Sequence, residues 1–130
     1  MTMNPTIAAG FSLAGRCLLA LLFLVEAWVK LNGYAGALAY TQKFGIPGFM
    51  LPGAIALELI GGLLIVIGWQ TRRAAIALAG FCLIAAFVFH TNFSQSNEVL
   101  HFLKDLAIAG GFLLLAVNGP GEWSVDERKR

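Results

Sequence analysis

Four apolar runs divide the chain, at residues 11–31, 51–69, 74–91 and 100–117, and short polar segments separate them. Each run is close to the length of about 20 mostly apolar residues that a transmembrane helix needs. The pattern therefore predicts an all-α integral membrane protein, a four-helix bundle in a single domain over residues 1–130. We expect the first run to be retained rather than cleaved, because no Lys or Arg precedes it.

One connection carries a further helix. The segment "YAGALAYTQKF" has apolar and polar residues at helical spacing, and Tyr34 and Tyr40 suit the headgroup level of a bilayer. It predicts a short interfacial helix between the first and second spans. At the other end, "NGPG" stops the fourth run, and we expect the polar tail "EWSVDERKR", residues 122–130, to have little regular structure.

Composition agrees with a membrane location. Hydrophobic residues make up 58% of the chain and charged residues only 12%, against about 25% charged in soluble domains. A net charge of +2, without interleaved basic and aromatic residues, predicts no nucleic-acid partner. Cys17 and Cys82 form no C-x-x-C pair, so a thiol–disulfide relay is not expected. The lipid bilayer is the expected surrounding, and self-association is left open.

Basic residues indicate the orientation. Four spans place both termini and the 70–73 connection on the same side, which holds Arg72, Arg73, Arg128, Lys129 and Arg130. Positively charged connections favour the cytoplasmic side. We therefore expect both termini, and the 118–130 tail, in the cytoplasm, with residues 32–50 and 92–99 facing outward.

This orientation brings ionisable residues from all four spans to the outer third of the membrane. A rise of about 1.5 Å per residue puts Glu26 about 8 Å and Glu58 about 10 Å below the outer surface. A charge at a helix centre costs about 2.5–3.5 kcal/mol, so such groups usually face the bundle interior and pair. The candidate ligand-binding residues are Glu58, His90, Lys104, Asp105, His101, Glu26 and Lys30.

We expect Glu58, His90 and Lys104 to line an outward-opening cavity, with Glu26 and Lys30 at its rim. Glu26 and Lys30 have the i, i+4 spacing of a local ion pair. Glu58 has no local partner, so it either pairs with Lys104, Lys30 or a histidine, or keeps its proton.

The sequence leaves open whether this network binds a ligand or only holds the helices in register. Histidines and carboxylates are suitable metal ligands, but no tightly spaced ligand motif occurs, and the sequence predicts neither a metal site nor a catalytic residue. Transport and metal handling are the lesser alternatives.

The chain resembles the DoxX family of small four-span bacterial inner-membrane proteins. The resemblance rests on "GRCLLALLFLVEAWVKLNGY", "FGIPG", "ALELIGGLLIVIGWQTRRAA", "FVFHTNF" and "FLKDLAIAGGFLLLAVNGPGEWSVD", in the family's order. The family pattern includes Lys30, Glu58, His90 and Lys104. Asp105 stands where many members have Asn, and the tail reads Ser-Val-Asp where Ser-Leu-Asp is usual.

The resemblance implies a location in the bacterial inner (plasma) membrane and a link to redox chemistry. The family is named for a subunit associated with sulfur-compound oxidation and the quinone pool, and other members are described as membrane partners of soluble redox enzymes. Two functions are therefore expected: a non-catalytic scaffold or accessory subunit of a redox-linked complex, or a redox subunit that binds a quinone or another small molecule. No cofactor is certain, although a quinone fits the resemblance.

Topology gives the first testable prediction. In a chain whose native cysteines are replaced by serine, a single cysteine at Ser96 should react with a membrane-impermeant maleimide in intact cells. A cysteine at Glu122 should react only after the membrane is opened, because the positively charged side faces the cytoplasm. Labelling of the tail from outside would overturn both the orientation and the depth argument.

Overall fold

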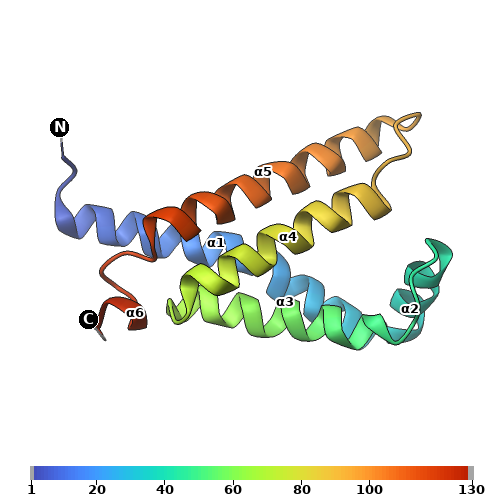
Figure 1. Ribbon diagram of the computed structural model, residues 1–130, viewed down its shortest axis with the longest axis horizontal. Helices are drawn as coiled ribbons and strands as arrows, with labels where there is room; N and C mark the ends of the chain where they lie inside the picture. Colours follow the sequence, from blue (N-terminus) through green and yellow to red (C-terminus); the bar gives the residue numbers. More distant parts are fainter. Residues whose placement is uncertain (1, 129–130) are drawn as a thin grey trace.

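The computed structural model describes residues 2–128 and builds this part of the chain from helices, without strands (Figure 1). The helices are α1 (Pro5–Asn32), α2 (Tyr34–Lys43), α3 (Met50–Ile67), α4 (Thr71–Phe89), α5 (Ser96–Asn118) and α6 (Val125–Arg128). Four of them, α1, α3, α4 and α5, are long and apolar enough to cross a membrane. The all-α prediction with four spans and a short helix after the first span is confirmed.

Helix α1 begins six residues before the first apolar run, because polar capping and not hydrophobicity sets its start. Asn4 Oδ1 accepts hydrogen bonds from the backbone N–H groups of Thr6 at 2.9 Å and Ile7 at 3.4 Å. Pro5 occupies the first turn, where its fixed φ suits a helix and its missing N–H costs nothing.

The spans pack as two pairs. Helix α1 packs mainly on α3 and α4 mainly on α5, while α3 and α4 join the pairs. The pairs lie close together near the two termini, here named the terminal end, and diverge toward the other end, the α2 end (Figure 1). Glycines allow the close contacts: a Cβ on Gly61 would lie 3.2 Å from Leu78, and one on Gly62 would lie 2.9 Å from Leu24.

Large apolar side chains remain exposed along every span, among them Leu18, Ile60, Ile84 and Leu114. In a soluble protein such a surface would drive aggregation, whereas lipid solvates it. The buried core is correspondingly small and is centred on Phe23, Leu78 and Phe112 and their alanine neighbours.

A buried arginine holds the terminal end together. Arg16 of α1 is 1% exposed, and its guanidinium donates to the carbonyl oxygens of Ile65 at 3.0 Å and Val66 at 2.7 Å. It also donates to the carbonyl oxygen of Trp123, in the C-terminal segment. Carbonyl oxygens at a helix C-terminus have no partner within the helix and carry partial negative charge. The Arg16 guanidinium therefore both satisfies the last carbonyls of α3 and offsets their charge.

The C-terminal segment has defined structure, so our expectation of little regular structure in the tail was wrong. Asp126, at the start of α6, accepts hydrogen bonds at 2.9 Å from the backbone N–H groups of both Gln70 and Thr71. It thereby caps α4, whose N-cap residue Gln70 makes no capping bond with its own side chain. Gly68 permits the approach, because its φ is +73° and a Cβ there would lie 2.4 Å from the Ser124 Cβ. The capping of α4 by Asp126 could not be predicted from the sequence, because a cap 55 positions away leaves no local pattern.

The cap gives a stability prediction. Asp126→Ala should lower the free energy of unfolding by about 0.5–2 kcal/mol, because it removes the partners of two backbone N–H groups. Thermal or denaturant unfolding of the purified protein in detergent would measure the change. Glu122→Ala, at an exposed position of the same segment, is the matched control. Equal stability of the two variants would show that the cap contributes nothing.

Candidate functional site

The first polar group of the site joins α1 to α3. Lys30, in the last turn of α1, forms an ion pair with Glu58 of α3, and its Nζ also lies 3.8 Å from Glu26 Oε2 one turn earlier in α1. The Glu58 side chain is fully buried, while those of Lys30 and Glu26 are 27% and 43% exposed. Of the three partners considered for Glu58, the structure therefore selects Lys30.

The second polar group joins α4 to α5. His90 ends α4, and its Nδ1 lies 3.2 Å from Glu98 Oε2, while its Nε2 lies 3.7 Å from Asp105 Oδ2. The ring of His101 stacks on that of His90, with centroids 5.2 Å apart. Like Lys30, His90 thus lies between two carboxyl groups.

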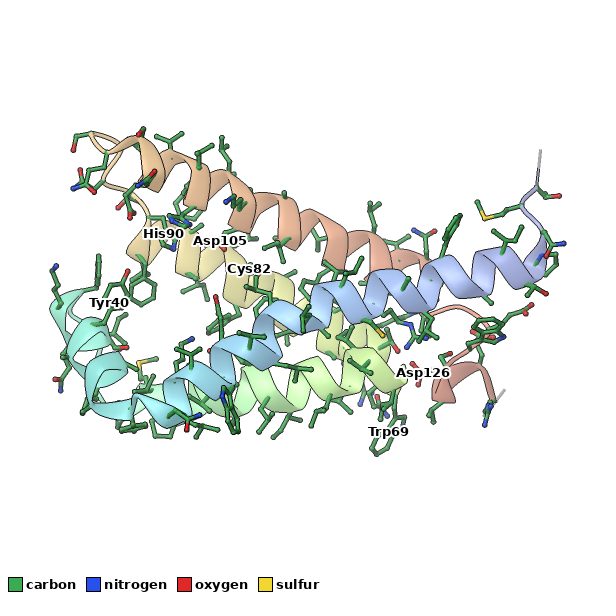
Figure 2. The ribbon with its side chains drawn as sticks, turned by 180° about the vertical axis from the view of Figure 1, so that it is seen from behind. Tyr40, Trp69, Cys82, His90, Asp105 and Asp126 are labelled. Atoms are coloured by element: carbon green, nitrogen blue, oxygen red, sulfur yellow. The ribbon has the colours of Figure 1, made fainter. Side chains whose placement is uncertain are left out.

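A cavity of about 300 Å³ lies between the two helix pairs, where they diverge toward the α2 end. Its polar lining consists of Glu26, Lys30, Tyr40, His90 and Asp105. Figure 2 shows His90, Asp105 and Cys82 on the α4–α5 side, with Tyr40 on α2 across from them. The volume is at the lower end of the range for small-molecule sites, about 300–1,000 Å³.

Apolar and aromatic side chains form the remaining walls. Phe23, Phe81 and Phe89 contribute rings to the lining, and Lys30 Nζ lies 5.8 Å from the centroid of the Phe81 ring. At the mouth, Tyr40 stacks on Phe89 with centroids 5.5 Å apart and 19° between the ring planes. This contact, with Phe44 also against Phe89 at 4.9 Å, attaches α2 to the end of α4.

The predicted site residues are only partly brought together. Glu26, Lys30, His90 and Asp105 line the cavity, and Glu58 lies behind Lys30 rather than in the lining. Lys104, which we expected in the lining, is exposed and outside it, because its position on α5 turns it away from α4. His101 is also exposed and outside the lining, although its ring stacks on that of His90 and its charge acts on Asp105.

Two participants were not predicted from sequence. Glu98 meets His90 because a short connection folds the start of α5 back onto the end of α4. Tyr40 has the character of an interfacial aromatic residue in the sequence, and only the placement of α2 turns it toward the cavity. The spacing of eight residues between His90 and Glu98, across the predicted connection 92–99, was the available signal.

The family model for DoxX matches residues 11–91, which include α2, α3 and α4 and the site residues Glu26, Lys30, Glu58 and His90. The chain belongs to the DoxX family. This DoxX protein is 50% identical to the inner membrane protein YqjF of Escherichia coli (strain K12) over 114 residues, which cover 88% of each chain. It is 33% identical to the E. coli inner membrane protein YphA over 123 residues, covering 89% of this chain and 88% of the relative.

A more distant relative is the Bacillus subtilis (strain 168) protein named "Putative oxidoreductase CatD". The identity is 33% over 86 residues, covering 66% of the DoxX chain and 63% of the relative. No solved structure matches the chain significantly. The family, the inner-membrane relatives and the four spans make this DoxX chain a multi-pass inner-membrane protein.

The Lys30–Glu58 pair gives a prediction about stability. Lys30→Met should destabilise by about 3–5 kcal/mol, because Glu58 would be left as an uncompensated buried charge. Glu58→Gln should cost less, because Lys30 keeps Glu26, and the double variant should recover part of the loss. Unfolding in detergent would measure all three variants. The exposed Lys104→Met is the control, and a Lys30→Met protein as stable as that control would refute the role of the pair.

Proposed function

We propose that the chain is a non-catalytic membrane subunit of a redox-linked complex, and that its cavity binds a small polar-headed molecule. The observation that carries the proposal is a preformed polar site in which Lys30 and His90 each lie between two carboxyl groups. If the network only held the helices together, we would expect close packing there, because protein interiors are close-packed, and not a cavity of about 300 Å³. Intramembrane ionisable residues that line a cavity usually mark a ligand pathway or site.

The arrangement supports a binding role more than a catalytic one. Lys30 and His90 are both engaged by carboxyl groups, so neither is poised as a free nucleophile or base. The redox link rests on the similarity to the B. subtilis protein whose name describes an oxidoreductase. In this proposal a soluble oxidoreductase partner supplies the electrons, and the isolated chain has no oxidoreductase activity.

A quinone is the second candidate for the ligand. The aromatic walls, which include Phe81 and Phe89, suit one quinone ring, and Tyr40 offers a hydroxyl donor to a carbonyl oxygen. Burial, together with the nearby carboxylate of Glu98, raises the pKa of Tyr40, so its hydroxyl keeps its proton at neutral pH. Lys104, which we expected to be a donor, lies outside the cavity. Within residues 2–128, no group of three or more His, Cys, Asp or Glu side chains is placed to hold a metal ion.

Mass spectrometry after gentle purification tests the proposal. The wild-type chain should retain a small molecule and a soluble oxidoreductase in a fixed ratio. Glu26→Gln should lose the small molecule but keep the partner, because Glu26 lines the cavity and lies within the bundle. The control, Lys104→Gln, should keep both.

Two results would contradict the proposal. Turnover of a redox substrate by the isolated chain would overturn the non-catalytic role. If no small molecule is retained and neither a short-chain quinone nor any other small polar-headed molecule binds, the cavity has no ligand function and only a scaffold role remains.

A further inference from the structure

The charges around the cavity do not balance. Four carboxyl groups surround one ammonium and one imidazole: Glu26 and Glu58 at Lys30, and Glu98 and Asp105 at His90. If every carboxyl group is ionised and His90 is protonated, four negative charges face two positive ones, which leaves an excess of two. The next basic side chains at this end, Lys43 and Lys104, are exposed and do not line the cavity. His101 stacks on His90, and its charge also acts on Asp105, so a protonated His101 would reduce the excess to one.

One of these acceptors lacks a donor. The Oε1 atom of Glu58 meets Lys30, but its Oε2 atom is buried and accepts no hydrogen bond from any residue in the described range, 2–128. The Glu58 carboxyl group also interacts with that of Glu26, which lines the cavity. A buried oxygen without a donor is costly at membrane depth. Glu58 does not line the cavity, so a cation bound there would act on it only through Glu26.

The walls also suit a positive charge. Aromatic ring faces carry negative charge density and attract ammonium groups. Phe81 already faces Lys30 Nζ at 5.8 Å, and the stacked pair of Tyr40 and Phe89 lies at the mouth. Carboxyl groups and ring faces together match a ligand with a cationic head and an apolar body.

From these three observations we propose that the cavity binds a small organic cation, a primary ammonium carried on an apolar body of about one ring. The inference rests on the ligand-binding role proposed above and names the class of ligand. An ammonium has three donors and a positive charge, so it would offset the excess of carboxyl groups and supply donors to them. A carboxylate ligand would be repelled, and a quinone, which offers only acceptors, would leave the excess unchanged.

Three ligands of nearly equal size test the proposal: benzylamine, benzyl alcohol and benzoate, titrated by calorimetry into the full chain in lipid nanodiscs. Benzylamine should bind about tenfold or more tighter than benzyl alcohol, because a charge-assisted hydrogen bond is stronger than a neutral one. Benzoate should bind most weakly. Glu26→Gln and Asp105→Asn should each reduce the preference for the amine, whereas Lys104→Gln should leave it unchanged.

The possible outcomes separate the two proposals. If benzyl alcohol or a short-chain quinone binds as tightly as benzylamine, the cation proposal is overturned and the binding role stands. If none of the ligands saturates a chain that unfolds at the wild-type temperature, the binding role itself fails. An amine signal that is equal in wild type, Glu26→Gln and Asp105→Asn would place the binding outside the cavity and also overturn the proposal.

Discussion

Lipid offers no hydrogen-bonding partner to a charged side chain, so each buried ionisable group of this chain must find its partner within the bundle. Arg16 satisfies this constraint with backbone carbonyls of α3 and the C-terminal segment. Lys30 satisfies it with the carboxyl groups of Glu26 and Glu58. One cation thus fixes α1 against α3 at each end of the pair, and the core between them needs only small residues and a few large ones.

The two ends of the bundle satisfy their buried polar groups in different ways. At the terminal end, side chains satisfy the ends of helices: Arg16 donates to carbonyl oxygens at the end of α3, and Asp126 caps the start of α4, beside a polar cavity of about 400 Å³. At the α2 end, the helix pairs diverge, and the polar groups of each pair face the space between them (Figures 1 and 2).

Helix α2 has a structural role in that site. It is the only described helix outside the four spans that contributes to the lining, through Tyr40. Its attachment depends on the rings of Tyr40, Phe44 and Phe89. The cavity is therefore bounded by four helices, α1, α2, α4 and α5, and its size and chemistry follow from how these are held apart.

The sequence alone determined the class of fold, because the length and apolarity of four runs leave few alternatives in lipid. It also indicated which ionisable residues lie near the same end of the bundle, since that follows from helix rise. Rotation of each helix about its axis was decided only by tertiary packing, and this put Lys104 outside the cavity and Tyr40 inside it. The partner of Glu58, the contact of Glu98 with His90 and the capping of α4 by Asp126 likewise join residues far apart in the chain. Local periodicity carries no information about such pairs, because their distance depends on the packing of whole helices.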